Sequence, residues 1–319
     1  FGSMPVHNLT VPADYATIQA AINAASSGHV IQCDAALYDE KVTIDKSLTL
    51  QGVSETGCII DGTGLGNGSG ISINNGITNV IIDKFTIKNH SGAGPNGYGG
   101  VYGAGNNNSL VVKNCTIRDN VGCCGFYADG PVNNVLLDNL EVFGHPNYSG
   151  NPARGIVIWN GVKSNITITN CEVYNNNCCG IELQNGSASG ITMTNNIVHD
   201  NWDNGMSAVG LNGSIGTNTI SSNTVTNNGR FGIEIKNPDG NGVNTIVSGN
   251  TVSLTGSFAG ARPTEKRDIV GIAAFRRALT GDNVDVPTGV SITGNTVSGY
   301  VQDNAMSTSE GFGIVVEGT

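Results

Sequence analysis

Two short motifs recur along this chain with a common period of about 25 residues. One is an apolar-x-apolar strand that ends in Asn or Cys, as in residues 191–196, and the other is Gly-apolar-x-apolar, as in residues 180–183. A chain that repeats two strands within one period returns above itself, so the sequence predicts an all-β coil of stacked rungs, a parallel β-helix. The end positions of the first motif are Phe85, Cys115, Leu140, Cys171, Asn196, Asn223, Asn250 and Asn295, and the glycines of the second are Gly100, Gly125, Gly155, Gly180, Gly205, Gly232, Gly271 and Gly313.

Apolar and polar residues alternate within both motifs, which predicts strands with one buried face. Like residues on successive rungs then stack about 4.8 Å apart. The column of Asn196, Asn223, Asn250 and Asn295 is therefore predicted to form a ladder of amide hydrogen bonds at a bend of the coil. This role is structural.

One amphipathic helix is predicted ahead of the repeat, over residues 14–25. Its apolar residues at 18, 21, 22 and 25 form one stripe, and such a helix would cover the open end of the core. We divide the chain into a remnant of an expression tag (residues 1–4), a cap helix with the first rungs (5–62) and one solenoid of further rungs (63–319). Loop insertions interrupt the solenoid near 253–268 and 278–288.

Residues 30–62 carry a more specific pattern, in which short apolar strands precede Cys33, Gly52 and Gly62. This segment resembles the entry segment of the pectin-lyase-like superfamily of carbohydrate-active β-helices, which includes pectin methylesterases and many polysaccharide lyases. The resemblance implies a single-stranded right-handed parallel β-helix with an N-terminal capping helix. The chemistry has to be argued from individual residues, because one fold hosts many functions. Motifs expected of polygalacturonases or mannuronan epimerases are not evident.

The net charge and the hydropathy of the chain argue against two classes of partner, nucleic acid and the membrane interior. The net charge of −10 argues against binding nucleic acid through the whole surface, and no run approaches 18 apolar residues, so membrane insertion is not predicted. We expect a monomer that is secreted or at the cell surface and has a polysaccharide as its partner. The last rung strand, near residues 311–316, is not followed by a polar cap, which suggests a larger multidomain chain.

The eight cysteines include two vicinal pairs, Cys123–Cys124 and Cys178–Cys179. An even number in a chain rich in Gly, Asn and Thr favours disulfides and an oxidising compartment, with free thiols or zinc as the alternatives. Zinc is disfavoured because CxxC spacing is absent and no His lies near either pair. Cys33 and Cys58 are 25 residues apart, which predicts a disulfide between neighbouring rungs. Cys115 and Cys171 are each expected to pair locally with a member of a vicinal pair.

The second and fourth residues after each motif glycine are predicted to point outward and to form two stripes on one wall. Aromatic and polar members of such stripes suit a sugar-binding groove, because aromatic faces stack on pyranose rings and polar groups bond hydroxyls. The alternative is an ordinary solvated sheet face whose aromatics reflect β-propensity. The candidate substrate-binding residues are Tyr102, Tyr127, Asp129, Trp159, Glu182, Gln184 and Phe275, with His199 and Arg230 beside them.

Cations cluster in residues 230–277, which hold seven of the 15 Lys and Arg and carry a net charge of +3. Such a cluster on an acidic chain suggests a site for an anionic ligand, although cations often merely decorate a solvated loop. Alginate lyases and chondroitinase B of the resembled superfamily use a Lys/Arg pair on neighbouring rungs for β-elimination. The resemblance therefore implies a polysaccharide lyase acting on a uronate polymer, with catalytic candidates Lys236, Arg276, Arg277 and Glu234.

Other interpretations stay open. Calcium is a possible cofactor, because Glu234, Asp203 or Asp239 could hold the ion against a substrate carboxylate. A glycoside hydrolase would use carboxylates of the stripes, although Glu182 and Glu234 are two rungs apart, which is wide for a catalytic pair. His199, predicted in a turn flanking the groove, is a further acid or base candidate. The alternative without catalysis is an extracellular glycan-binding or adhesion module.

Overall fold

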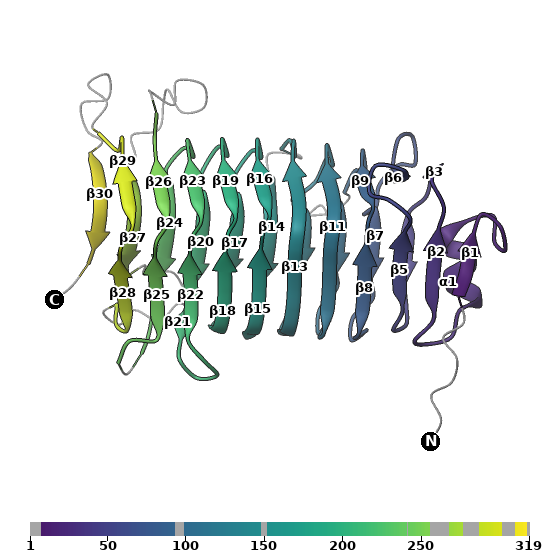
Figure 1. Cartoon of the computed structure of the whole chain (residues 1–319), viewed down its shortest axis with the longest axis horizontal. Coiled ribbons are helices and arrows are strands. Elements are labelled where there is room, and N and C mark those ends of the chain that lie inside the picture. The colour runs from purple at the N-terminus through teal and green to yellow at the C-terminus, as the bar shows by residue number, and fades with distance from the viewer. Residues whose placement is uncertain are drawn as a thin grey trace.

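The chain forms one parallel β-solenoid, seen side-on in Figure 1. The structure is a computed structural model and describes residues 8–92, 99–147, 152–240, 242–255, 268–276, 287–301 and 310–317. The expected tag remnant and most of the two expected insertions lie outside these residues. Within the described ranges, no helix has the length and apolar character needed to cross a bilayer.

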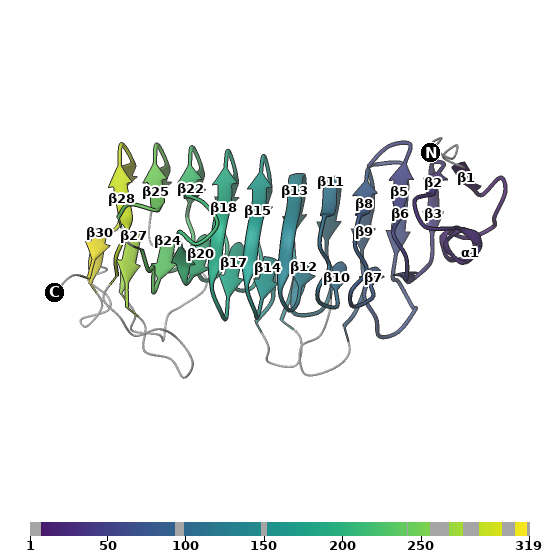
Figure 2. The same ribbon diagram turned by 90° about the horizontal axis from the view of Figure 1, so that it is seen from below.

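One wall of the solenoid is a ten-stranded parallel sheet, which holds the Gly-apolar-x-apolar motifs. Its strands lie along one side of the solenoid in Figure 2. The strands are β4 (Val42–Ile44), β7 (Ile71–Ile73), β10 (Val101–Gly103), β12 (Cys124–Ala128), β14 (Arg154–Trp159), β17 (Ile181–Gln184), β20 (Met206–Val209), β24 (Phe231–Lys236), β27 (Ile269–Phe275) and β30 (Gly311–Val316).

A twenty-stranded sheet, bent along its length, forms the other two walls. The first wall contains β1 (Asn8–Val11), β2 (Val30–Cys33), β5 (Thr49–Gly52), β8 (Val80–Asp83), β15 (Lys163–Thr169), β18 (Ala188–Thr194), β21 (Leu211–Asn212), β22 (Asn218–Ser221), β25 (Thr245–Ser248) and β28 (Val290–Thr293). The second contains β3 (Ala36–Tyr38), β6 (Cys58–Asp61), β9 (Thr86–Lys88), β16 (Glu172–Tyr174), β19 (Ile197–His199), β23 (Thr224–Thr226), β26 (Thr251–Ser253) and β29 (Thr296–Ser298). The long strands β11 (Leu110–Arg118) and β13 (Val132–Phe143) run through both walls.

The predicted helix is α1 (Ile18–Ala24), which begins four residues later than expected. Thr17 caps it, because its Oγ1 accepts a hydrogen bond of 3.0 Å from the Ala20 amide. Ile18, Ala21 and Ile22 are buried, and the helix packs against β1, β2 and β4. It lies at the N-terminal end of the solenoid in Figure 1, as the cap prediction requires.

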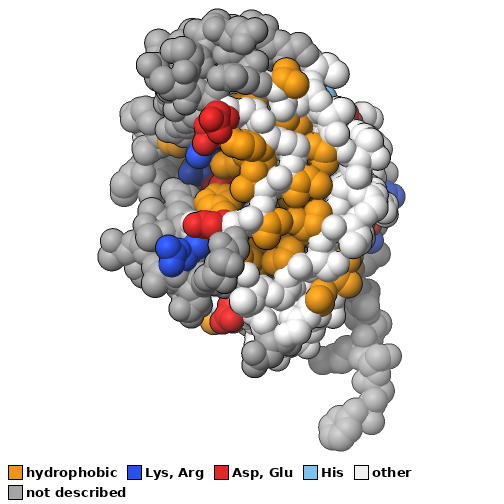
Figure 3. Space-filling view, turned by 90° about the vertical axis from the view of Figure 1, so that its left-hand side faces the viewer, with side chains coloured by type: hydrophobic (Ala, Val, Ile, Leu, Met, Phe, Trp, Pro, Cys, Tyr) orange, Lys and Arg blue, Asp and Glu red, His pale blue; other side chains and the backbone are white. Residues whose placement is uncertain are grey.

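The opposite end of the solenoid exposes apolar side chains. Figure 3 looks onto this end and shows hydrophobic side chains gathered at its centre. On β30, Ile314 and Val316 are exposed, and Val301 near the end of the chain is exposed as well. The last described rung therefore presents the cross-section of the core.

The predicted asparagine ladder is confirmed. Asn196, Asn223 and Asn250 each donate from Nδ2 to the Oδ1 of the next Asn, at 3.0, 2.9 and 2.8 Å. Each Nδ2 also donates to a carbonyl of the preceding rung, so both hydrogens of the buried amide are satisfied. The ladder thus locks successive rungs in register.

A second ladder, which the sequence analysis did not identify, lies at the bend before the ten-stranded sheet. Asn176 donates to Asn201 at 2.9 Å, and Asn201 donates to Asn228 at 3.0 Å. On earlier rungs the same column holds His90, Asn120 and His145, whose backbone and side-chain atoms bond from rung to rung. Burial lowers the pKa of both His90 and His145 to about 4, because the charged imidazolium would lose its hydration.

The motif glycines from Gly100 to Gly271 are required by close packing between rungs, and those from Gly100 to Gly205 lie against this second ladder. A Cβ placed on Gly180 would lie 2.5 Å from Cγ1 of Val198 and 2.8 Å from both Nδ2 of Asn201 and the Gly205 carbonyl oxygen. No real Cβ tolerates such contacts. The glycine column therefore marks where the ten-stranded sheet meets the ladder.

The predicted Cys33–Cys58 disulfide and the predicted local pairing of Cys115 and Cys171 are both wrong. Cys123 and Cys124 form a disulfide, and the other six cysteines are free and buried. Cys33 is in register with Gly52, which is 19 residues away, whereas Cys58 is in register with Ala36. The first rungs are shorter than 25 residues, so the spacing of these two cysteines does not place them opposite each other. Cys115 and Cys171 instead donate to the carbonyls of Lys113 and Thr169 at the ladder bend.

Candidate functional site

The two predicted stripes exist as columns on the outer face of the ten-stranded sheet. The second-position column is in register throughout, from Tyr102 to Val315. Its central part runs Val157, Glu182, Ser207, Glu234 and Ala273. In the other column, Trp159 pairs with Gln184, and Lys236 pairs with Phe275. The rung alignment derived from the sequence is therefore correct at these positions.

The stripes are not the ordinary solvated sheet face considered as the alternative, because their central side chains are buried. Glu182, Glu234 and Lys236 are 4 %, 2 % and 1 % exposed. They lie outside the core, whose side chains come from the alternate positions such as Ile233 and Ile235. The partly exposed members Tyr102, Trp159 and Phe275 lie at the margins, and the exposed Arg276 directly follows Phe275.

A charged pair occupies β24. Nζ of Lys236 lies 3.3 Å from Oε2 of Glu234. The same oxygen accepts hydrogen bonds from Oγ of Ser207 at 2.6 Å and from Nδ2 of Asn204 at 2.8 Å. Glu234 is thus held by three donors from two adjacent rungs.

A second charged pair lies two rungs away. Glu182 on β17 pairs through Oε2 with Nε of Arg154 on β14, and its Oε1 accepts a hydrogen bond of 3.0 Å from Gln184. The Arg154 guanidinium also stacks over Trp159, 5.1 Å from the ring centroid. We use the name polar cluster for Arg154, Glu182, Gln184, Asn204, Ser207, Glu234 and Lys236 together.

Apolar clusters flank the polar cluster on the same face. On the N-terminal side, the rings of Tyr102 and Tyr127 stack at 5.7 Å beside Val157 and Trp159. On the C-terminal side, Phe231 packs 5.8 Å from Phe275. The polar cluster therefore lies between two clusters that contain aromatic side chains on this face.

Three predicted site residues lie near the ends of the strands. Arg230 precedes β24 and stacks 4.4 Å from the ring of Phe231. Arg276 follows β27, and its amide donates to Oε2 of Glu317 at 2.9 Å. Asp129 follows β12 and accepts a hydrogen bond of 2.7 Å from Asn160 on the next rung. Arg277 lies outside the described residues.

The two aspartates proposed as calcium ligands are not brought together. Asp203 lies before β20, where its carbonyl accepts from the Arg230 amide, whereas Asp239 lies beyond the other end of β24 and bonds to Leu211. The neighbours of Asp203 are the thiols of Cys178 and Cys179. The hydrogen bond with the Cys179 thiol lowers the pKa of Cys178, and Arg154 acts in the same direction, while burial opposes both.

His199 is not beside the stripes. It lies on β19, in the second wall of the twenty-stranded sheet, with Nδ1 2.7 Å from Asp200 and Nε2 3.2 Å from Glu172. Its ring stacks on Tyr174 at 4.9 Å, and Tyr174 stacks on Phe143 at 4.7 Å. The prediction of a turn position flanking the groove is therefore wrong.

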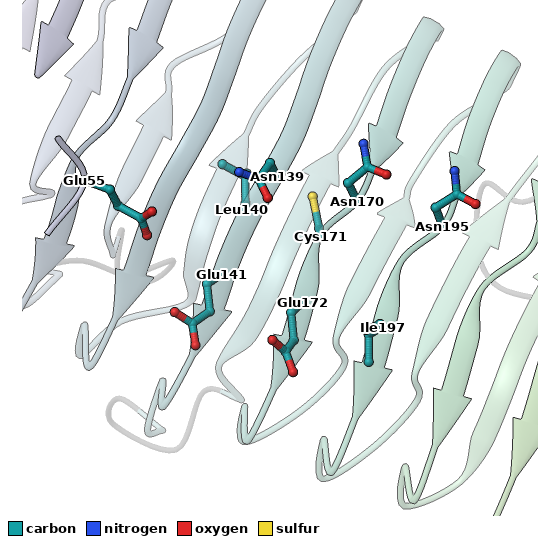
Figure 4. Close-up of a pocket in the computed structure, with 9 residues that line it drawn as sticks. All are labelled: Glu55, Asn139, Leu140, Glu141, Asn170, Cys171, Glu172, Asn195 and Ile197. Atoms are coloured by element: carbon teal, nitrogen blue, oxygen red, sulfur yellow. The ribbon is translucent and has the colours of Figure 1, made fainter. Parts of the chain in front are cut away.

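A cleft of about 420 Å³ opens on this second wall. Figure 4 shows Glu141 and Glu172 side by side on neighbouring strands, with Glu55 reaching toward them. Glu141 and Glu172 are in register on β13 and β16. Glu141 accepts a hydrogen bond of 2.8 Å from the Tyr174 hydroxyl, which together with burial raises the Tyr174 pKa. The remaining lining residues are Asn139, Leu140, Asn170, Cys171, Asn195 and Ile197.

Comparison with known families agrees with this architecture. The family described as right handed beta helix region matches residues 18–219. The chain belongs to this β-helix family. A search of curated proteins found no match.

Solved structures of other β-helix proteins share the fold. A double mutant of the periplasmic alginate epimerase AlgG aligns with 98 % of this chain and 84 % of its own, at 15 % identity and a TM-score of 0.53. The Family 28 exopolygalacturonase of Yersinia enterocolitica aligns with 94 % of this chain and 62 % of its own, at 14 % identity and a TM-score of 0.50. At these identities the likeness shows the fold.

Sequence reasoning missed Arg154, Asn204 and the acidic cleft. Arg154 and Asn204 directly precede the motif glycines Gly155 and Gly205, in a column that was not aligned. Reading that column would have shown Cys124, Arg154, Cys179 and Asn204 on successive rungs. The carboxylates of the cleft lie in the other motif, where Glu141 and Glu172 follow the ladder position.

Proposed function

We propose that this β-helix protein acts on an acidic polysaccharide at the outer face of the ten-stranded sheet and cleaves it by β-elimination. The observation that carries the proposal is the Glu234–Lys236 ion pair, which is buried outside the core. Val157 and Ala273 occupy the same column as Glu234, so the fold accepts apolar residues there. A buried ion pair adds little stability over such residues, which favours a functional role.

The cations near this face are the reason for assigning an anionic substrate. Lys236 on β24 and Arg276 at the end of β27 lie on adjacent strands, and Arg230 lies at the start of β24. Cations placed along one face attract a polymer that carries a carboxylate on each sugar. Trp159, Tyr102 and Phe275, which are partly exposed at the margins, offer ring faces for the sugars. AlgG and the exopolygalacturonase are named for uronate polymers, and we assign this class here on the chain's own cations.

The geometry suggests roles that differ from those expected. The charge beside Lys236 is a carboxylate, so we assign Lys236 and Arg276 to neutralise the uronate carboxylate and the enolate that develops from it. Glu234 is assigned as the base that removes the proton α to that carboxylate. Its described donors all reach Oε2, so Oε1 is the oxygen assigned to the proton transfer. The C–O bond to the leaving sugar then breaks as the double bond forms. The leaving oxygen takes up a proton from water, and Glu234 returns its proton to solvent.

The test is release of unsaturated product from uronate polymers, followed by its ultraviolet absorbance. We expect turnover by the native protein, loss of turnover with retained binding in Glu234→Gln, and weaker binding in Lys236→Met. Glu172→Gln, on the other wall, is the control and should be fully active. Polymer binding without product would instead indicate a glycan-binding module, and the absence of both would refute the proposal.

The cleft supports a second candidate, glycoside hydrolysis. Glu141 and Glu172 are in-register neighbours on parallel strands, whose backbones lie about 4.8 Å apart. That spacing is close to the roughly 5–5.5 Å between the two carboxyl groups of retaining glycosidases. New reducing ends without unsaturated product, lost in Glu141→Gln and kept in Glu234→Gln, would favour this candidate over elimination.

A further inference from the structure

Cys178, Cys179 and Asp203 form a cluster of potential metal ligands at the edge of the ten-stranded sheet. The two cysteines directly precede Gly180, the motif glycine before β17, and Asp203 lies at the matching position one rung later. One ligand atom from each residue lies within 4.8 Å of the other two. Both thiols are buried, and the carboxylate is partly exposed.

The two sulfurs are spaced for chelation. Their separation is 3.6 Å. Two thiolates bound to one zinc ion at about 2.3 Å and a tetrahedral angle lie roughly 3.75 Å apart, whereas a disulfide would require about 2.05 Å. An ion can therefore bridge the sulfurs with a displacement of about 0.1–0.2 Å.

Asp203 is fixed in position to supply the third ligand. Its amide donates a hydrogen bond of 2.8 Å to the Cys178 carbonyl, which anchors its backbone against the neighbouring rung. A rotation of the side chain then brings the carboxylate toward the sulfurs. Three protein ligands and one open position are the arrangement of many zinc sites that act on a fourth ligand.

The vicinal pair Cys123–Cys124 can be compared with Cys178–Cys179 within the same molecule. Cys123 and Cys124 occupy the same motif position two rungs earlier, and there the sulfurs are bonded to each other. On the rung after Cys123, Ala153 is the residue at the same distance before the motif glycine as Asp203, and Arg154 is the residue whose amide bonds to the Cys123 carbonyl. Neither offers a carboxylate. The two pairs thus differ in the carboxylate that a metal would need.

Charge also suits a cation between thiolates. Arg154 lies on the preceding rung in the column of Cys179, and it pairs with Glu182. With Glu182 included, the two thiolates and the Asp203 carboxylate make four negative charges beside one guanidinium, so a bound divalent ion reduces the net charge of the cluster from −3 to −1.

We propose that Cys178, Cys179 and Asp203 bind a zinc ion. Thiolates are soft ligands that select zinc or cadmium, and calcium takes oxygen ligands, so Asp203 belongs to a zinc site and not to the calcium site that its charge alone suggested. The missing CxxC spacing does not exclude this site, because adjacent residues and a neighbouring rung supply the ligands. The proposal is independent of the elimination reaction.

The experiment measures zinc bound by the reduced, full-length protein in competition with a chromophoric chelator. We expect one ion per chain, no ion in Cys178→Ser/Cys179→Ser, and a dissociation constant raised about tenfold or more in Asp203→Asn. The matched control, Cys123→Ser/Cys124→Ser, should still bind one ion. Cobalt in place of zinc should give thiolate charge-transfer absorption, and excess calcium should not displace it.

Three outcomes would overturn the proposal. They are no zinc bound by the native protein, an unchanged stoichiometry in Cys178→Ser/Cys179→Ser, or a disulfide between Cys178 and Cys179 that forms despite saturating zinc. Far-ultraviolet circular dichroism of each variant separates loss of the site from loss of the fold.

Discussion

Glu182 on β17 forms an ion pair with Arg154, which lies on the preceding strand of the same sheet, and both side chains are largely buried. Neither residue contributes to the core, whose apolar side chains point to the other side of the sheet. Substitutions in this pair therefore change the polar cluster without changing the apolar core, so their effect on the free energy of unfolding reports on the polar cluster.

Replacing one member of this pair should cost more than replacing both. Glu182→Leu leaves a buried guanidinium without its carboxylate, and we expect a loss of about 3–5 kcal/mol in the free energy of unfolding. Arg154→Met combined with Glu182→Leu should recover most of that loss. Urea unfolding of Glu182→Leu, Arg154→Met and the double variant measures these losses against the native protein. Additive losses in the double variant would show that the two side chains do not act as a pair.

The motif glycines should be intolerant of a methyl group wherever another rung covers them. Gly180→Ala is expected to lower the free energy of unfolding by about 1–3 kcal/mol, because its Cβ would overlap Val198 and Asn201. Gly313 is the matched control at the same motif position on β30, where an added Cβ would find its nearest neighbour at 3.9 Å. Gly313→Ala should leave the urea midpoint nearly unchanged. Equal losses at both positions would contradict this account of the glycine column.

Acid should destabilise the protein through its buried histidines. His90 and His145 have a folded-state pKa of about 4, below the value of about 6.5 in an unfolded chain. The unfolded state therefore takes up protons first, so their contribution is complete above about pH 6.5 and is lost as the pH falls toward 4. The loss is of the order of 3 kcal/mol for each histidine.

The second ladder offers a test of this pH dependence, because both Asn and His occupy its column. Asn120 and Asn176 occupy the same column as His145, so His145→Asn should be accommodated. We expect this variant to lose less stability than the native protein between pH 6.5 and 4, as measured by urea unfolding at each pH. An identical pH profile in the two proteins would assign the acid sensitivity to other groups.

Six thiols per chain should react when the protein is unfolded without reductant. The structure pairs Cys123 with Cys124 and leaves the other six cysteines reduced. Alkylation in urea with a chelator present, followed by intact mass, should therefore show six adducts. Peptide mapping should place the remaining disulfide on the vicinal pair, and a Cys33–Cys58 link in the map would overturn the assignment.

The sequence was sufficient to predict the fold and the rung alignment because the two strand motifs recur on many successive rungs. The columns from Tyr102 to Val315 follow directly from counting after each glycine. The same counting failed at Cys33 and Cys58, since the entry rungs have another length. Counting by the period therefore places residues correctly only on rungs of equal length.

Burial and pairing within the site could not be predicted in the same way. The alternation of residues shows that Lys236 and Glu182 point away from the core, but their burial depends on what packs over the outer face. The partner of Lys236 was expected to be other cations, and it is Glu234, two residues away on the same strand. His199 was misplaced because the six residues 200–205 separate it from β20, and this length is enough to place it on another wall.

The two ladders fasten each turn of this chain to the turns before and after it, and this has a consequence for how such molecules can change. Adding or removing one whole rung between Tyr102 and Lys236 would leave the cross-section intact and change the distance between these two residues by about 4.8 Å. The length of polymer that the outer face can span would therefore change in steps of one rung. The kinds of residue that pack the core would stay the same.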